Sequence, residues 1–342
     1  MNTIYCGKIS NFHGELIMVV KGLKNLENII VKELPFIYEK SSTKLLEELL
    51  TNNEDIIPDG ISMINAPFMW SKNITGKNVK IAIIDTGCDL THEDLKSKII
   101  GGRNFTSEDN KNVNIYQDYN GHGTHVCGIV AGSKNNRGII GVAPDAKLII
   151  LKALDKNGSG TLQGIINAIN YAVSLKVDII SMSLGTTSDV PQLHQAIVKA
   201  INNNILVVCA AGNEGDNNSS TDEYSYPGVY NEVISVGAID YKKTAARFTD
   251  SNKEVDLLAP GVNIVSTYLN NSYAMLSGTS MATPHVTGAL ALLIEWSIKE
   301  FGRRLTEAEL YGQLIKNTET LDMARSLQGN GLLFMNPKFV TK

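Results

Sequence analysis

The feature that most constrains the fold is a series of short, β-branched apolar runs that alternates with longer stretches of helical spacing from about residue 77 onward. The runs are 79–84, 147–151, 177–181, 205–210, 233–236 and 255–258. Runs of this length without polar alternation are typical of strands that are buried on both faces. Residues 162–175 and 191–202, which lie between them, have the spacing of helices. We therefore predict an α/β fold of three layers, with helices on both faces of a parallel sheet.

Composition limits the classes of partner. The chain has 342 residues, is 43% hydrophobic and carries a net charge of -4, which suits one large domain with a short extension. Because the net charge is not positive, nucleic acid and anionic membranes are not expected as partners. The longest apolar candidate for a membrane span, residues 288–294, is far too short to cross a bilayer.

Residues 1–60 differ in composition from the rest, so we assign them to an N-terminal extension and residues 61–342 to the main domain. Within the extension, the Lys/Glu-rich stretch 40–50 predicts a short amphipathic helix. Polar residues interrupt the first twenty positions, which therefore do not form a secretory signal. The four cysteines show no close pairing. Together these features predict a cytoplasmic protein with free thiols.

The segment at 84–89, IDTGCD, places Asp85 where a buried strand is predicted to end. The carboxyl ends of parallel strands are where functional groups gather in such a sheet. An aspartate at this place could equally cap the following turn, so by itself Asp85 is weak evidence of function.

The segment at 120–126, NGHGTHV, contains His122 and His125 at a spacing that could place both on one helix face. A metal site would need a third ligand and a general base nearby, and no HExxH pattern is present. Each histidine alone could also be a satisfied structural residue. The glycines on either side of His122 let other backbone approach closely, as a catalytic imidazole requires.

The segment at 277–285, SGTSMATPH, precedes an apolar helical run. Because Pro284 is acceptable only in the first helical turn, we predict that the helix begins at about Ser280. A serine at a helix start is usually an N-cap. This helix start would also offer N–H groups and a positive dipole end to an oxyanion formed beside the hydroxyl.

Taken together, the three segments follow the order Asp, His, Ser. Serine needs a base to take its proton, and the base needs a carboxylate to hold its tautomer. This order differs from those of the chymotrypsin type and the α/β-hydrolases. The segment AAGNEG adds Asn213 directly after a predicted strand that ends at Ala210. Its amide could donate to a developing oxyanion, although an Asn beside Gly is more often a turn residue.

At this point the chain resembles the subtilisin family. The motifs DTG, GHGTHV, AAGNEG and SGTSMATPH occur in the family's order, and the resemblance extends from about residue 66 to residue 291. Within the family the chain is most similar to the intracellular subtilisins, through DTGCD, VDIISMSLG, VVCAAGNEGD, YNEVISVGA and GNGLLF. The resemblance implies a subtilisin-like peptidase domain at 61–342 that hydrolyses peptide bonds of proteins through an acyl-enzyme.

The resemblance assigns roles to single residues. Asp85 would orient His122, which would act first as general base and then as general acid. Ser280 would be the nucleophile, and its backbone N–H with the side chain of Asn213 would form the oxyanion hole.

The resemblance also implies where the substrate binds. Ser183, Leu184 and Gly185 would be a strand edge that pairs with the substrate backbone. Residues 211–212, which include Gly212, and residues 225–227 would enclose the residue before the scissile bond. Because Ser225 stands where the family often has Gly, the family's side-chain preferences are not carried over.

A structural calcium ion is a further implication. Asp94 and Asn135 match two side-chain ligands of the family, and the carbonyls of Ser133, Arg137 and Ile139 would complete the site. Ligands that are all oxygens suit Ca²⁺. The alternative is an ordinary Asn/Gly surface loop.

The stretch 33–38, ELPFIY, resembles a short motif in the extension of intracellular subtilisins, which lies across the active site and is later removed. The chain would then be a self-processed zymogen whose partners are polypeptide substrates and, as in many intracellular subtilisins, a second copy in a homodimer. The alternative for this stretch is an edge strand or a solvated arm.

Three other functions remain open at this point. A processing protease for one peptide precursor would share the mechanism and differ only in its substrate profile. A catalytically silent binding protein on the same fold would have no chemical need for all of Asp85, His122, Ser280 and Asn213. A serine esterase is disfavoured by the strand edge at 183–185.

Overall fold

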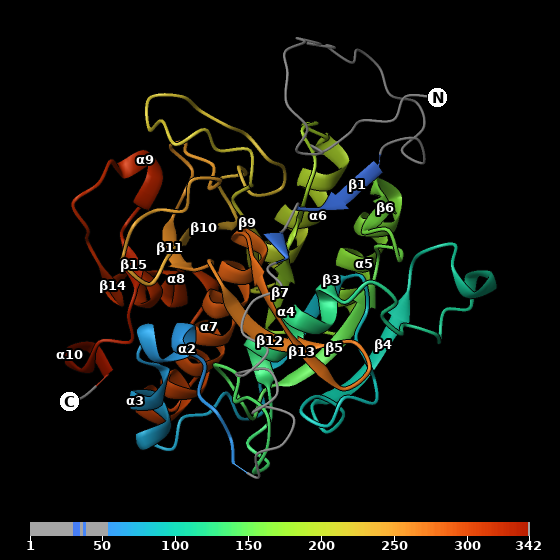
Figure 1. The fold of residues 1–342 in the computed structure, drawn as a ribbon, viewed down its shortest axis with the longest axis horizontal. Coiled ribbons are helices and arrows are strands. Elements are labelled where there is room, and N and C mark those ends of the chain that lie inside the picture. Colours follow the sequence, from blue (N-terminus) through green and yellow to red (C-terminus); the bar gives the residue numbers. More distant parts are fainter. Residues whose placement is uncertain (1–29, 35–36, 39–53, 341–342) are drawn as a thin grey trace.

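The computed structural model describes residues 30–34, 37–38 and 54–340 (Figure 1). The helix predicted at 40–50 lies outside these residues, as does Cys6. Cys88, Cys127 and Cys209 are buried free thiols. They occupy core positions, as their small apolar side chains favour.

One large sheet organises the described part of the chain. Its nine strands follow the order β14-β15-β11-β10-β9-β7-β3-β5-β4. Their bounds are Lys80–Asp85 (β3), Ile99–Asn104 (β4), Lys147–Lys152 (β5), Ile179–Met182 (β7), Leu206–Ala210 (β9), Ile234–Ile239 (β10), Leu257–Pro260 (β11), Thr318–Glu319 (β14) and Leu332–Leu333 (β15). Every pair is parallel except β14 with β15. The predicted parallel sheet is therefore confirmed, and each predicted run lies within two residues of a strand start.

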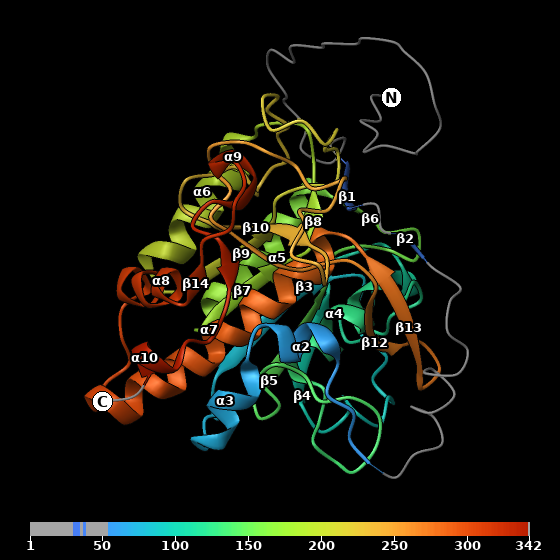
Figure 2. The same ribbon diagram turned by 60° about the vertical axis from the view of Figure 1, so that its left-hand side comes forward.

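Helices cover both faces of this sheet (Figure 2). On one face α4 (His122–Ala131) and α7 (Thr279–Phe301) pack over one core, and on the other α5 (Leu162–Ser174) and α6 (Pro191–Asn202) pack over a second core. Side chains of β3 alternate between the two cores: Ile81 and Ile83 face the first, and Ala82 and Ile84 the second. Burial on both faces explains why the strands are continuous apolar runs.

Helix α7 differs from the prediction in one respect. It begins at Thr279, and Pro284 lies inside it, beyond the first turn. A proline cannot donate to the carbonyl four residues earlier, which here belongs to Ser280. The Ser183 hydroxyl donates to that carbonyl at 3.0 Å. A bond from the segment between β7 and β8 thus replaces the missing helical bond and fixes the helix start at the serine.

Two small sheets contain strands of the extension. In the first, β1 (Ile30–Glu33) lies between β6 (Ser159–Thr161) and β8 (Leu184–Gly185), antiparallel to both. In the second, β2 (Ile37–Tyr38) pairs with β13 (Ser272–Ser277), whose other neighbour is β12 (Ile264–Tyr268). Figures 1 and 2 both show β1 beside β6, although the two are distant in the sequence.

Short elements complete the domain. They are α2 (Asp59–Met63), α3 (Ala66–Ser71), the 3-10 turn η2 (Asp109–Lys111), α8 (Glu307–Lys316), α9 (Arg325–Gln328) and α10 (Pro337–Val340). A reciprocal capping box between Thr306 and Glu309 starts α8. Among the helices of the described residues, none has the length and apolar character needed to cross a membrane.

Candidate active site

Three elements place the predicted triad residues at the carboxyl edge of the sheet. Asp85 is the last residue of β3, His122 is the first residue of α4, and Ser280 is the second residue of α7. All three side chains are buried. Each residue sits at the end of an element, where a side chain can approach groups from other elements.

Asp85 holds the imidazole of His122 directly. His122 Nδ1 lies 2.8 Å from Asp85 Oδ1, which also accepts the backbone N–H of Thr86 at 2.7 Å. The Thr86 hydroxyl in turn accepts the N–H of Gly123 at 2.9 Å. A Cβ on Gly123 would lie 2.2 Å from the carbonyl of Gly87. Only glycine lets the helix start come this close to the Asp-bearing loop.

The charges around His122 favour its protonated form. Burial lowers the pKa of an imidazole, but the Asp85 carboxylate raises it, Glu33 and Asp118 add to that effect, and the pKa of His122 reaches about 9. With β1 in place, the imidazole is therefore charged at neutral pH. In that form it cannot accept a proton from a nucleophile.

Ser280 and Asn213 are both tied to neighbouring backbone. The Ser280 hydroxyl donates to the carbonyl of Ser183 at 3.3 Å. Asn213 Oδ1 accepts both the N–H and the hydroxyl of Thr279, at 2.9 and 2.8 Å. Because its oxygen is held in this way, the planar amide also has its Nδ2 donor fixed in direction. A fixed donor is what an oxyanion hole would require.

Asp118 has a role at this site that the sequence did not reveal. Its carboxylate accepts the N–H groups of Asn120 and Gly121 at 2.9 and 3.0 Å, and both the N–H and the hydroxyl of Thr124 at 3.0 and 2.7 Å. It thus caps the first turn of α4, which begins with His122. An aspartate that precedes an Asn-Gly turn and a helix was the available signal.

The predicted strand edge receives the chain's own extension. In the register of β1, Lys32 lies opposite Gly185 and Glu33 opposite Leu184. The other side of β1 pairs with β6, an edge that the motifs did not predict. The cleft therefore has two backbone edges, and an extended peptide between them completes a three-stranded sheet.

Leu34 is fully buried, and it lies against Gly185 of the predicted strand edge. A Cβ on Gly185 would lie 2.8 Å from Leu34 Cδ2 and 2.2 Å from Ser225 Oγ. A Cβ on Gly212 would lie 2.9 Å from the Cβ of Ser225. The two glycines make room, and Ser225 narrows the pocket between them. After Leu34 the chain reaches Pro35 and Phe36, which lie outside the described residues.

Beyond that gap, the extension pairs with a second part of the domain. Ile37 lies opposite Ser277 and Tyr38 opposite Leu276, and both partners belong to the strand that leads directly into α7. The two extension strands therefore flank the segment that carries Ser280. The sequence had predicted contact with the first edge only.

The residues of the expected calcium site also come together, through their N–H groups and not through the carbonyl oxygens that would bind an ion. Asn135 Nδ2 donates to Asp94 Oδ1 at 3.0 Å, the N–H of Ile139 donates to Asp94 Oδ2 at 3.0 Å, and the N–H of Ser133 donates to the Asp94 carbonyl at 3.0 Å. The N–H of Arg137 donates to Asn135 Oδ1 at 3.1 Å. A cation would require the Asn135 amide to turn over, so that its oxygen faces the ion. One buried carboxylate with amide and carbonyl oxygens has the donor chemistry that suits Ca²⁺.

His125 is a structural residue in this arrangement. Its Nε2 lies 3.0 Å from the carbonyl of Ile264 and 3.2 Å from that of Ala274. Burial lowers its pKa to about 3, so the ring is neutral. Within the part of the chain that the structure covers, no three His, Cys, Asp or Glu side chains form a cluster that could hold a metal ion.

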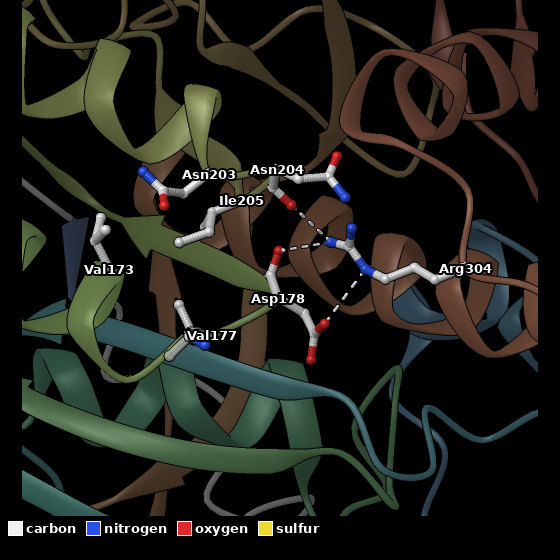
Figure 3. A pocket seen from close by; sticks show the side chains of 8 residues that line it. Val173, Val177, Asp178, Asn203, Asn204, Ile205 and Arg304 are labelled. Atoms are coloured by element: carbon white, nitrogen blue, oxygen red, sulfur yellow. Dashed lines mark hydrogen bonds and ion pairs between the residues drawn. The ribbon is translucent and has the colours of Figure 1, made fainter.

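A pocket of about 300 Å³ lies at the opposite, amino edge of the sheet (Figure 3). Arg304 reaches across it, with Nε 3.3 Å from Asp178 Oδ1, and donates to the carbonyls of Asp178 and Asn204 at 3.4 and 3.0 Å. The pocket lies where strands β7 and β9 begin, and the ion pair between Arg304 and Asp178 closes it. It contains none of the predicted site residues.

Comparison with the sequences of known proteins identifies a family and several relatives. A family model described as the subtilase family matches residues 76–332. The major intracellular serine protease of Bacillus subtilis (strain 168) is 54% identical over 290 residues, which cover 84% of this chain and 90% of that protein.

Two further relatives extend the comparison. An intracellular serine protease of Paenibacillus polymyxa is 56% identical over 279 residues, which cover 82% of this chain and 85% of that protein. Subtilisin E of Bacillus subtilis (strain 168) is 42% identical over 259 residues, which cover 75% of this chain and 66% of that protein. The relatives named as intracellular are thus similar over more of this chain than subtilisin E is.

Proposed function

The chain belongs to the subtilase family and is a subtilisin-type serine protease, and from that premise we propose that it is an endopeptidase made as a self-processed zymogen in the cytoplasm. Asp85, His122 and Ser280 are its triad in this proposal. The names of the two intracellular relatives support the location. Polypeptides are its substrates.

The chemistry follows from the geometry of these three residues. Neutral His122 takes the proton of the Ser280 hydroxyl as the oxygen attacks the substrate carbonyl, and Asp85 stabilises the imidazolium that forms. His122 then returns the proton to the leaving amine, which leaves an acyl-enzyme on Ser280. A water molecule, activated by the same imidazole, releases the acid and restores the enzyme.

Asn213 stabilises the intermediate that forms between these steps. Its oxygen is fixed by Thr279, so Nδ2 is oriented before the substrate arrives and needs no reorganisation during the reaction. The backbone N–H of Ser280, at the start of α7, is the second donor in this proposal. The positive end of the helix dipole adds to their effect.

The observation that carries this proposal is the position of β1. It occupies the cleft as an extended strand between two backbone edges, with Leu34 in the side-chain pocket. A peptide substrate bound in the same way would present the carbonyl of the residue in Leu34's place to Ser280. An esterase would have no use for two edges that pair with a polypeptide backbone.

The same observation supports a role for the extension as an inhibitory segment. In this proposal the bond that follows Leu34 occupies the scissile position, and Pro35 protects it. Proline fixes φ and has no N–H, so its peptide bond is a poor substrate for a site that aligns an extended backbone. Self-cleavage elsewhere in the extension would then let this segment leave the cleft, so that a substrate can bind.

The test compares full-length Ser280→Ala protein with a Ser280→Ala variant that begins at Pro58. If the extension occupies the cleft, removing it should tighten the binding of a peptide aldehyde inhibitor substantially. In active protein, Pro35→Ala should speed self-cleavage at the N-terminus. Equal affinity of the two proteins for the inhibitor would show that the extension does not block the site.

The catalytic proposal has its own experiment. The full-length chain, incubated until its activity is constant, should react with a fluorophosphonate probe and digest casein, and the Ser280→Ala protein should do neither. Labelling without digestion of casein would favour a processing protease for one precursor, and substrate profiling would then identify the sequence. Absence of labelling would favour a silent binding protein.

A further inference from the structure

Glu33 places a carboxyl group inside the cleft, beside the general base. Its backbone N–H donates to the carbonyl of Gly158 at 2.8 Å, and in the β1 register it lies opposite Leu184. It directly precedes Leu34, whose side chain fills the pocket. This inference rests on the proposed function, in which Leu34 takes the place of the substrate residue whose carbonyl Ser280 attacks. Glu33 therefore takes the place of the residue directly before it, which we call the penultimate residue.

The subsite around this side chain is shaped by two residues. Asn120 Nδ2 donates to Glu33 Oε1 at 3.3 Å, and Asn120 Oδ1 accepts the backbone N–H of His122 at 3.0 Å. On the other side, a Cβ on Gly158 would lie 2.1 Å from Glu33 Cδ. Gly158 also has a φ of 68°, which favours glycine. A side chain of the length of glutamate thus fits between a glycine floor and an amide donor.

This subsite offers a carboxyl group only one direct donor. Among the described residues, no hydrogen bond reaches Glu33 Oε2, which is buried. A buried carboxylate is stable only when its oxygens are paired. A single amide donor is enough for a neutral oxygen acceptor and too little for a full negative charge.

The charged groups that face Glu33 belong to three elements. His122 of α4 attracts the carboxylate, whereas Asp85 of β3 and Asp118 of the preceding turn repel it. Burial, the largest effect, and these groups together raise the pKa of Glu33 from 4.5 to about 7. The attraction also disappears when His122 becomes neutral, which is the form that catalysis needs. In that form the subsite faces only the two carboxylates.

We propose that Asn120 and Gly158 form a specificity subsite that selects a long, uncharged hydrogen-bond acceptor in the penultimate residue of the substrate, namely glutamine or neutral glutamic acid. Ionised glutamate is disfavoured there for two reasons. Its charge is poorly solvated in the subsite, and it shifts His122 towards the protonated, inactive form. Asn120 is the specificity-determining residue, since it supplies the donor.

The pH dependence has a definite sign. A carboxyl group whose pKa is higher when bound than when free binds together with a proton. Binding of a glutamate peptide is therefore strongest below pH 4.5, weakens as the pH rises towards about 7, and is constant above that value. A glutamine peptide has no such proton, so the ratio between the two peptides isolates the effect from the titration of His122.

The experiment uses four chromogenic peptide amides that copy the extension, Val-Lys-Xaa-Leu, in which Xaa is Gln, Glu, Leu or Lys. The full-length chain is first incubated until its activity is constant, and kcat/KM is then measured for each peptide from pH 5 to pH 9. The Gln peptide should exceed the Leu peptide by about threefold to tenfold at every pH, as one net hydrogen bond predicts. The ratio of Glu to Gln should fall by about tenfold or more between pH 5 and pH 7.5 and then stay constant.

A pair of variants tests the donor. Asn120→Ala should bring the Gln to Leu ratio to about one, whatever it does to the absolute rates. Asn157→Ala is the matched control, because Asn157 is an exposed neighbour at the rim of the cleft, and it should leave the ratio unchanged. The ratio is independent of the amount of active enzyme, so partial misfolding of a variant cannot produce the result.

The outcomes separate this inference from the proposed function. Cleavage of all four peptides with a flat Glu to Gln ratio, or a Gln to Leu ratio that survives Asn120→Ala, would overturn the subsite and leave the protease intact. Cleavage of none of them, by protein that also fails to digest casein, would overturn the proposed function and the subsite with it.

Discussion

The two edges of the parallel sheet use charged residues in opposite ways. At the amino edge, the guanidinium of Arg304 pairs with the Asp178 carboxylate and donates to the carbonyl of Asn204, so opposite charges meet in the pocket of Figure 3. At the carboxyl edge, Glu33 Oε2 is buried without a hydrogen-bond partner among the described residues, and the carboxylates of Glu33, Asp85 and Asp118 surround His122. A concentration of like charge around one imidazole, and not the size of a hollow, therefore distinguishes the edge where we propose that catalysis takes place.

One helix connects the two edges. The 23 residues of α7 begin with the Ser280 segment and end just before Arg304, a length of about 35 Å at 1.5 Å per residue. The same helix therefore presents Ser280 at one edge and leads to the ion pair at the other. Substitutions at its two ends should separate effects on rate from effects on stability.

The largest expected effect is loss of the nucleophile or the base. Ser280→Ala or His122→Ala should each lower kcat by about a millionfold, and replacement of Asp85 should cost somewhat less. These magnitudes are those of subtilisin, a member of the same family, and are adopted for this chain. Single-turnover and steady-state assays would measure them, with the unfolding midpoint as the control for folding. Near-normal turnover of purified Ser280→Ala protein would end the proposal that this edge is catalytic.

Asn213→Ala should have the next largest effect. Because the amide donates only when the oxyanion forms, we expect kcat to fall by about 10²–10³ with little change in KM; this range too is that of subtilisin. Steady-state kinetics on one peptide amide gives both constants. If the loss appeared mainly in KM, Asn213 would instead bind the substrate's ground state.

Glu33→Gln tests whether the charge at the carboxyl edge acts on the base. In full-length Ser280→Ala protein, the substitution removes one of the carboxylates that hold the pKa of His122 at about 9, so this pKa should fall. Titration of the imidazole ring protons by NMR would measure the change. Glu93→Gln, an exposed carboxylate paired with Lys96, is the control, and an equal shift in both variants would mean that Glu33 does not act locally.

Calcium should affect stability more than rate. An ion that binds only the folded chain stabilises it by mass action, so a chelator should lower the unfolding midpoint and speed self-digestion. Asp94→Ala should abolish that dependence, because it removes the single carboxylate of the proposed site. Scanning calorimetry of the Ser280→Ala protein, which cannot digest itself, gives the midpoint. If the chelator left both properties unchanged, no ion of consequence would bind there.

The smallest effect on activity is expected at the amino edge. Arg304→Met should lower the free energy of unfolding by about 1–2 kcal/mol, because it leaves the partly buried Asp178 without its charged partner, and kcat/KM should stay the same. Arg303→Met, which removes a more exposed pair with Glu309, should cost less. Urea denaturation measures both. A large loss of kcat/KM in Arg304→Met would contradict the division between the two edges.

The sequence predicted the sheet and the triad for the same physical reason. Strands such as β3 are buried on both faces, which leaves a continuous apolar run, and Asp85 ends such a run. The motif around His122 carries its own glycines, and the structure shows other residues packed closely against both. Features that a segment determines by itself could therefore be predicted.

Other features depend on contacts between distant segments and could not be predicted in the same way. Strand β6 is only Ser-Gly-Thr, and it is a strand because β1 pairs with it. The position of Pro284 inside α7 depends on the Ser183 hydroxyl, which is about a hundred residues away in the sequence. Asp118 became recognisable only when its four bonds to the start of α4 were visible.

The cleft between β6 and β8 has a consequence for which proteins in a cell would be cut. A substrate must supply several consecutive residues in extended form with both backbone edges unpaired, as β1 does. In a folded protein the backbone N–H and C=O groups of such a segment already form hydrogen bonds in helices and sheets. Freeing them costs much of the free energy of local or global unfolding. Damaged, misfolded or newly made chains offer such segments without that cost. The shape of the cleft alone would therefore direct degradation to chains that have lost their structure, with no separate recognition element.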